Sequence, residues 1–351
     1  MSKGSSHIPS LDGIRALSFS CVFLAHAGLP GIPGLFGVTV FFFLSGFLIT
    51  TLLRRELSKT GHVSLKHFYL RRVLRILPPF YLILAAAALL SAYGISGPHF
   101  ETRAVLAQAM HYANYWIAFH GFQGFPAGTG VYWSLAVEEH FYLLFPWLFV
   151  ALERAGLSNG RKVAVLLGLC ALSLVWRCVL VMGTGASIDR TSVASDTRFD
   201  SILFGCALAL FENPVLDSTQ VRERVWKYVL LPLSLLVMLS TFVVRSDVFR
   251  ETFRYTLQGL ALVPLFVCAM RYPGWGPMRL LNLRPIAFVG TLSYSLYLLH
   301  QVVLASITTL QPAWGTGKVA ALGILVSGVV AYVVYVAVEK PCAVLRRRLQ
   351  A

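Results

Sequence analysis

The amino-acid sequence predicts an all-α, polytopic membrane protein built as a helical bundle of about ten transmembrane helices. Of the 351 residues, 57% are hydrophobic and 13% are charged, and the mean hydropathy is +0.70. Soluble domains contain about 25% charged residues. Long apolar runs recur from one end of the sequence to the other. Both observations are typical of a chain that is surrounded by the lipid bilayer.

Ten apolar runs have roughly the length that a membrane-spanning helix requires. The run near 199–212 is short, and we expect it to tilt or to cross only part of the bilayer. Most cysteines lie inside such runs and none forms a CxxC pair, so we interpret them as small buried side chains. The predicted spans lie near 12–28, 35–53, 75–93, 134–153, 163–182, 199–212, 226–244, 253–270, 286–309 and 319–338.

The formal net charge of +15 is concentrated in the loops between the apolar runs. This distribution indicates membrane topology and argues against nucleic acid as a partner. With about ten spans, the basic segments fall on one face, and the positive-inside rule makes that face cytoplasmic. We expect both termini to be cytoplasmic. The basic segments are 54–75, 154–162, 222–227, 271–284 and 340–348.

One aromatic-rich segment, 101–125, does not fit a transmembrane span. Counting it as a span would place the later basic loops outside, so we predict an outer-face or re-entrant helix. The start of the chain imitates a signal peptide, but a second apolar run begins near Leu35. We therefore expect His26 to be retained. The sequence predicts a single domain over 1–351, with its core at about 9–341 and no soluble domain.

His26 near the end of the first apolar run is an ionisable side chain at an energetically costly place. Such residues within membrane spans usually belong to functional sites. Arg15 lies roughly 16 Å away along the helix, and Asp12 is three residues before Arg15, within pairing distance. The alternative is a histidine satisfied at the lipid interface. The topology places Asp12 and Arg15 at the cytoplasmic mouth and His26 towards the outer side.

Glu138 and Glu139 are adjacent carboxyl groups near the outer end of the fourth predicted span. Ser134, Glu138 and Tyr142 are spaced by four residues and therefore share a helix face. One interpretation is helix capping together with a favourable interaction with the helix dipole. The functional interpretation is that a glutamate orients or polarises His26.

Arg71, Arg72 and Arg75 precede the third predicted span. Arg72 and Arg75 are three residues apart, and arginine side chains bind phosphates in bidentate fashion. The alternatives are a topology anchor or a patch that binds anionic lipid head groups. No metal-ligand spacing, glycine-rich phosphate loop or GxSxG elbow is present in the sequence.

Several further polar residues lie in apolar surroundings. Ser45, next to Gly46, favours close helix packing. Arg198 and Asp200 open the sixth span and either pair structurally, together with Arg177, or line an acceptor cleft. Near 290–300, polar side chains are equally compatible with helix–helix hydrogen bonds and with substrate contact. They are Ser293, Tyr294, Tyr297 and His300.

The ordered set of motifs resembles the membrane acyltransferase-3 family, the integral-membrane O-acyltransferases of polysaccharides and related acceptors. The resemblance runs from about Pro9 to about Pro341. One departure is His140, where the family often has glutamine after the double glutamate. The matching motifs are LDGIRALS with Arg15 and His26, FFFLSGFLIT, RRVLRILPPF, YWSLAVEEHFYLLFPW, RFDSILFG, GTLSYSLYLLH and the closing Glu339-Lys340-Pro341.

The resemblance implies transfer of an acyl group, usually acetyl, from cytoplasmic acyl-CoA to a hydroxyl of a saccharide such as an O-antigen, an exopolysaccharide or a lipid-linked glycan. It implies a bacterial cytoplasmic membrane, acetyl-CoA as a donor substrate and no permanently bound cofactor. The alternatives are a flippase or transporter of a lipid-linked sugar, or an acyltransferase that acts on a macrolide, because a fold does not define an acceptor.

Taken together, the residues and the resemblance predict three groups of side chains. The catalytic group is His26, Glu138 and Glu139, with His26 either removing the hydroxyl proton or carrying the acetyl group. The group expected to bind acyl-CoA is Arg15, Arg71, Arg72 and Arg75. The group expected to support the substrate is Asp12, Ser45, Ser134, Tyr142, Arg198, Asp200, Tyr294 and His300.

Overall fold

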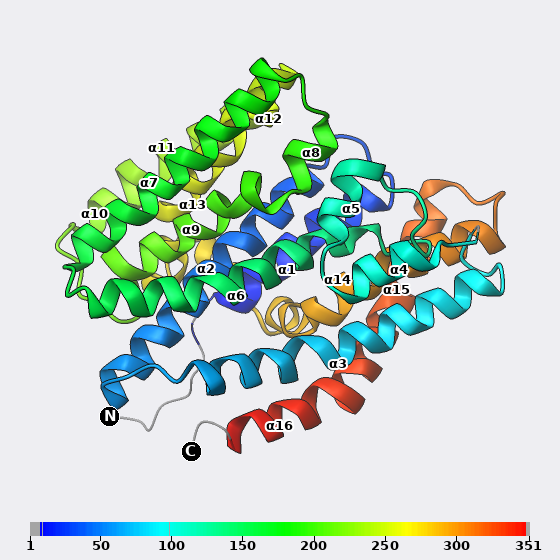
Figure 1. Ribbon diagram of the computed structural model, residues 1–351, viewed down its shortest axis with the longest axis horizontal. Helices are drawn as coiled ribbons and strands as arrows, with labels where there is room; N and C mark the ends of the chain where they lie inside the picture. Colours follow the sequence, from blue (N-terminus) through cyan, green and yellow to red (C-terminus); the bar gives the residue numbers. More distant parts are fainter. Residues whose placement is uncertain (1–7, 9, 98, 349–351) are drawn as a thin grey trace.

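The computed structural model describes residue 8, residues 10–97 and residues 99–348, and within these every regular element is a helix. The elements pack as one helical bundle (Figure 1). The α-helices are α1 (Leu11–His26), α2 (Gly34–Thr60), α3 (Leu65–Ala92), α4 (Thr102–Ala109), α5 (Ala113–His120), α6 (Trp133–Arg154), α7 (Asn159–Cys178), α8 (Ile188–Val193), α9 (Ser195–Phe211), α10 (Glu223–Val225), α11 (Leu231–Val243), α12 (Asp247–Glu251), α13 (Phe253–Arg271), α14 (Arg284–Leu310), α15 (Thr316–Val334) and α16 (Lys340–Arg348).

The predicted helical membrane bundle is confirmed, and a helix covers each of the ten predicted spans. Eight helical stretches of the described residues are long and apolar enough to cross a membrane. The other two are α1 with 16 residues and α9 with 17. At 1.5 Å per residue both measure about 25 Å, slightly less than a hydrocarbon core of about 30 Å. The expectation of a short sixth span therefore fits α9.

Helix α9 lies inside the bundle, in contact with α2, α6, α7 and α13 (Figure 1). Its contact with α2 is close because glycines meet backbone there: a Cβ on Gly46 would lie 2.0 Å from the Ile202 carbonyl oxygen, and one on Gly205 would lie 2.0 Å from that of Phe43. Small residues allow this close approach, which matters in a membrane because the hydrophobic effect contributes little to helix association there. Helix α1 packs between α14 and α2.

The segment 101–125 forms two eight-residue helices, α4 and α5, rather than the single predicted helix. The break is at His111, whose φ of 54° is left-handed. Its ring packs against Phe80, with centroids 4.7 Å apart, and its Nε2 has no hydrogen-bond partner in the described part of the chain. Burial, and secondly the charge of His140, lowers the pKa of His111 to about 4. The ring is therefore neutral near pH 7, and its role is structural.

Candidate active site

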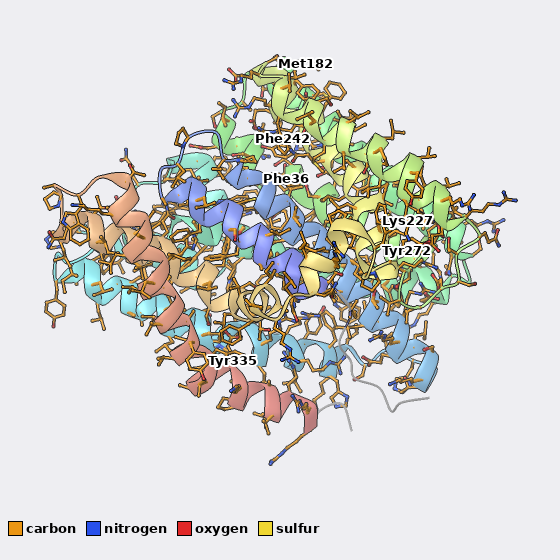
Figure 2. The ribbon with its side chains drawn as sticks, turned by 180° about the vertical axis from the view of Figure 1, so that it is seen from behind. Phe36, Met182, Lys227, Phe242, Tyr272 and Tyr335 are labelled. Atoms are coloured by element: carbon orange, nitrogen blue, oxygen red, sulfur yellow. The ribbon has the colours of Figure 1, made fainter. Side chains whose placement is uncertain are left out.

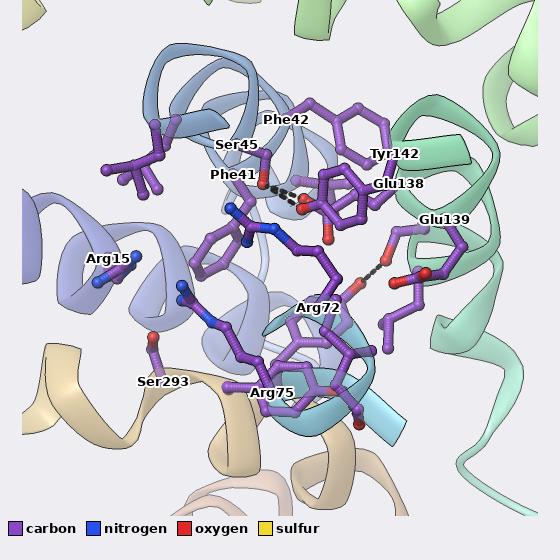
Figure 3. Close-up of a pocket in the computed structure, with 18 residues that line it drawn as sticks. Arg15, Phe41, Phe42, Ser45, Arg72, Arg75, Glu138, Glu139, Tyr142 and Ser293 are labelled. Atoms are coloured by element: carbon purple, nitrogen blue, oxygen red, sulfur yellow. Dashed lines mark hydrogen bonds between the residues drawn. The ribbon is translucent and has the colours of Figure 1, made fainter. Parts of the chain in front are cut away.

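Helices α1, α2, α3, α6 and α14 surround a narrow cavity of about 90 Å³, here called the arginine–glutamate pocket (Figure 3). Nine of the predicted site residues line it, although they are distributed over residues 15–294 of the sequence. The polar and charged side chains that line the pocket are Arg15, Ser45, Arg72, Arg75, Ser134, Glu138, Glu139, Tyr142, Ser293, Tyr294 and Tyr297.

Arg72 and Arg75 reach this pocket because they lie inside helix α3 and not at its start. The sequence predicted a span from residue 75, whereas α3 begins at Leu65 and is N-capped by the Ser64 hydroxyl. The Arg72 guanidinium lies 5.3 Å from the centre of the Tyr142 ring. Both arginines extend towards Arg15 (Figure 3), and among the described residues neither has a carboxylate within 4.0 Å. Their guanidinium groups therefore face the cavity without a direct ion pair among the described residues, and Glu138 and Glu139 line the same cavity.

Arg15 and Asp12 form the predicted pair at the start of α1, with Nη1 3.0 Å from Oδ1. The pairing is local, since the residues are three apart on one helix face. It positions the Arg15 guanidinium at the cavity wall opposite the two arginines of α3 (Figure 3).

The face of α6 predicted from the spacing of Ser134, Glu138 and Tyr142 does line the pocket. The Ser45 hydroxyl of α2 donates a short hydrogen bond to Glu138, and Tyr142 donates to Ser45 Oγ at 3.0 Å. One turn of α6 nearer its start, the hydroxyls of Ser134 and Tyr297 lie 2.7 Å apart. These bonds hold Glu138 beside the arginines, so capping of α6 does not explain its position.

The prediction that a glutamate orients His26 is wrong in its geometry. The hydrogen-bond partner of His26 is His300 of α14, with Nδ1 of His26 2.9 Å from Nε2 of His300. The rings stack at 5.2 Å between centroids. Glu138 and Glu139 lie in the arginine–glutamate pocket, on the same side as the arginines that were predicted to lie opposite them. A catalytic role for either glutamate stays a prediction.

The histidine pair assigns the protons of both rings. His300 Nδ1 lies 2.8 Å from the Tyr297 carbonyl oxygen and 3.2 Å from that of Leu296, and carbonyls only accept. His300 Nδ1 therefore carries a proton, and in the neutral ring Nε2 accepts. His26 Nδ1 must then be the donor, which leaves the lone pair on His26 Nε2. That nitrogen is available as a base or a nucleophile.

His26 lines a second and wider cavity of about 590 Å³, here called the His26 pocket. Its walls come from α1, α2, α6, α11, α13, α14 and the segments 31–34 and 244–250. At its edge the rings of Phe36 and Phe242 meet edge to face at 5.3 Å (Figure 2). Both cavities are lined by Val38 and Tyr297, so these two side chains stand between the arginines and His26.

Sequence reasoning missed the wall contributed by α13. Arg254, Tyr255 and Gln258 line the His26 pocket, and Arg254 pairs with Glu251 at 3.3 Å. A signal was present, because an arginine and a glutamine within an apolar helix are costly unless they serve a site. Helix α6 adds the aromatic surface of Trp133.

Five of the predicted site residues line neither cavity: Asp12 and His300, which are described above, and Arg71, Arg198 and Asp200. Arg71 pairs with Glu56 of α2 at 2.6 Å and does not line the pocket. Asp200 pairs with Arg177 at 2.7 Å, and both side chains are fully buried. Arg198 donates to the Thr39 hydroxyl and lies 3.9 Å from the centre of the Tyr255 ring, behind the wall of the His26 pocket. The sequence left two alternatives for Asp200, a structural pair or an acceptor cleft, and the structure shows the pair with Arg177.

The chain belongs to the family described as "Acyltransferase domain", whose model matches residues 8–339. The family resemblance predicted from the motifs is thereby confirmed. The chain is 29% identical over 86% of its length to "Peptidoglycan O-acetyltransferase OatA" of Listeria monocytogenes, and 29% identical over 95% to "Putative peptidoglycan O-acetyltransferase YrhL" of Bacillus subtilis. It spans about half the length of these relatives, 50% and 55%. No solved structure matches the chain.

Proposed function

We propose that the chain is a membrane O-acyltransferase that moves an acetyl group from acetyl-CoA to a hydroxyl of a saccharide. The donor reaches the arginine–glutamate pocket from the cytoplasmic side, and the acceptor enters the His26 pocket from the outer side. Both termini are cytoplasmic in this proposal, as the basic loops favour. The names of the relatives support acetyl as the acyl group and a cell-wall glycan as the kind of acceptor.

The observation that carries the proposal is the pair of cavities on either side of Val38 and Tyr297. One presents Arg72 and Arg75, which have no carboxylate within 4.0 Å among the described residues, and guanidinium groups suit the phosphates of a CoA thioester. The other presents a histidine nitrogen in a space wide enough for a sugar. Arg15 and His26 lie roughly 16 Å apart along α1, a separation that the extended pantetheine arm has to bridge.

The chemical step requires a base for the acceptor hydroxyl. Its oxygen attacks the thioester carbonyl carbon while its proton moves to His26 Nε2. The carbon–sulfur bond then breaks, the sulfur leaves with the electron pair, and the imidazolium returns the proton to it. The products are an O-acetyl ester and CoA thiol, and His26 is neutral again. His300 stabilises the imidazolium because its Nε2 accepts from His26 Nδ1.

A two-step route uses the same nitrogen. His26 Nε2 attacks the thioester carbon, the carbon–sulfur bond breaks, and CoA leaves as the thiolate, which gives an acetyl-imidazolium. The sugar oxygen then attacks the acetyl carbon, the carbon–nitrogen bond breaks to restore neutral His26, and the hydroxyl proton balances the thiolate as CoA thiol. In both routes Glu138 and Glu139 act on the donor side, where they lie beside Arg72 and Arg75. Incubation with labelled acetyl-CoA in the absence of acceptor separates the routes, because only the second labels the protein at His26.

His26→Ala tests the proposal. We expect loss of acetyl transfer by roughly 10²–10⁴-fold or more, the usual contribution of a general base, with unchanged amounts of protein in the membrane. The matched control is His120→Ala, which removes an exposed histidine from α5. The measurement is acetyl-CoA-dependent O-acetylation of cell-surface glycan. Near-normal acetylation in His26→Ala contradicts the proposal, and acetyl-CoA-independent movement of a lipid-linked sugar indicates a flippase.

A further inference from the structure

The last helix of the described chain, α16, lies along α3 (Figure 1). It presents one face to the bundle, because Cys342, Ala343 and Arg346 are half-buried whereas Val344 and Arg347 are exposed. Positions 342, 343 and 346 fall on one side of a helix. Arg346 is therefore the member of the run Arg346–Arg348 that turns towards α3.

The helix that α16 packs against, α3, also carries arginines. They are Arg71, Arg72 and Arg75, and all three are half-buried. Four carboxylates lie near these arginines: Glu56 pairs with Arg71, Glu339 accepts a hydrogen bond from Ser295 at 2.5 Å, and Glu138 and Glu139 line the pocket with Arg72 and Arg75. Among the described residues Arg346 has no carboxylate within 4.0 Å. Arg346 thus faces a helix that carries three arginines, and it has no direct ion pair of its own among the described residues.

Like charges held together destabilise a fold unless an anion is bound between them. A basic last turn is favoured by the helix dipole, which accounts for arginines at the end of α16. The dipole does not account for the direction of Arg346, because the exposed Arg347 and Arg348 satisfy it equally. The direction towards other guanidinium groups favours a ligand with several negative charges, since guanidinium binds phosphate with two parallel hydrogen bonds.

The size of the arginine–glutamate pocket gives a second reason. Its volume of about 90 Å³ is well below the 300–1,000 Å³ that drug-sized ligands occupy. It suits a narrow arm and excludes a nucleotide. A nucleotide attached to that arm has to remain outside the pocket.

We propose that Arg346 of α16 and the arginines of α3 form a phosphate-binding mouth that holds the nucleotide phosphates of the acyl-CoA donor. This inference rests on the proposed function and adds to it a residue and a helix at the C-terminal end of the chain. Arg72 and Arg75, which also line the pocket, then bind the phosphates from α3, and Arg346 binds them from α16. The same chemistry would also bind an anionic lipid head group.

Donor analogues separate these roles. The full chain is reconstituted in nanodiscs of phosphatidylcholine, and KM and kcat are measured with acetyl-CoA and with acetyl-pantetheine, which has no phosphate. Arg346→Gln should raise KM for acetyl-CoA on the order of tenfold, the effect of one lost charge-assisted hydrogen bond. It should leave kcat and the KM for acetyl-pantetheine unchanged. Arg346→Lys should recover part of the loss, because lysine keeps the charge without the fork.

The matched control is Arg347→Gln, which removes the same charge from the exposed neighbouring position. An equal increase in KM in this control overturns the proposal, because the effect would then be diffuse charge. An effect of Arg346→Gln that requires added phosphatidylglycerol also overturns it and assigns the site to lipid. Calorimetric measurement of CoA binding distinguishes failure of the phosphate-binding mouth from failure of the proposed function. If the protein binds CoA, Arg346→Gln weakens that binding and no acetyl transfer is found, the mouth is supported and the proposed function is contradicted.

Discussion

His300 determines which nitrogen of His26 is left free towards the His26 pocket. The chain of donors runs from His26 Nδ1 to His300 Nε2 and from His300 Nδ1 to the Tyr297 carbonyl. Each link has one possible direction once the carbonyl is fixed as an acceptor. The Phe19 ring meets His300 edge to face at 5.7 Å and restricts its rotation. His300 is thus a positioning residue in the proposed reaction.

Replacing His300 should lower kcat more than it changes KM for acetyl-CoA. His300→Ala removes the acceptor for His26 Nδ1–H, so the reactive tautomer loses its advantage and the imidazolium loses its partner. The loss should stay below the roughly 10²–10⁴-fold of a missing base. His300→Gln keeps an acceptor oxygen and should recover part of kcat. The readouts are kcat across pH and thermal stability. A loss of activity that follows the loss of stability, without a change in the pH profile, would make His300 purely structural.

The residue types of the site were readable from the sequence, but their grouping was not. Ionisable side chains in apolar runs are conspicuous one at a time, which identified His26, Glu138 and Arg72. Their partners depend on where each helix begins and on its neighbours. Helix α3 starts ten residues before the predicted span, and that difference moved Arg72 and Arg75 to the level of Glu138. His26 and His300 are 274 residues apart, a separation that a helical period cannot reveal.

At the scale of the element, helix positions followed from hydropathy because the bilayer imposes a length on every span. The crossing of α2 and α9 depends instead on two glycines that the hydropathy of the chain does not register. Gly46 and Gly205 meet the backbone of the opposite helix, and this contact brings α2, with Ser45, towards α6. The close crossing therefore supports the Ser45–Glu138 hydrogen bond.

Gly205→Ala should destabilise the protein. The new Cβ would lie 2.0 Å from the Phe43 carbonyl oxygen, so α2 and α9 would have to separate. Overpacking of this kind costs about 1–3 kcal/mol. Gly168→Ala in α7 is the control, because among the described residues nothing outside its own helix lies within 4 Å of the added Cβ, and alanine favours helix. Thermal unfolding in detergent provides the measurement. Equal melting temperatures for the two variants would contradict the assigned packing.

At the scale of the whole molecule, the proposal requires the two cavities to face opposite compartments. Acetyl-CoA is made in the cytoplasm, so the α3–α16 end has to be inside and the segment 244–252 outside. The basic loops favour this orientation through the positive-inside rule. Eight helices of the described residues are long and apolar enough to span the membrane. Helices α1 and α9 are not among them, because they are short for a span. Either eight or ten spans keep both ends of the chain on one side.

Cysteine labelling tests the orientation directly. Ser58 at the end of α2 and Ser246 before α12 are both exposed, and serine to cysteine changes one atom. In intact cells a membrane-impermeant maleimide should label Ser246→Cys and leave Ser58→Cys at the level of the wild type, whose six native cysteines set the background. Permeabilised cells should show labelling of both. The reverse pattern would place the arginines of α3 outside, where they could not meet cytoplasmic acetyl-CoA. The donor assignment and the phosphate-binding mouth would then both be excluded.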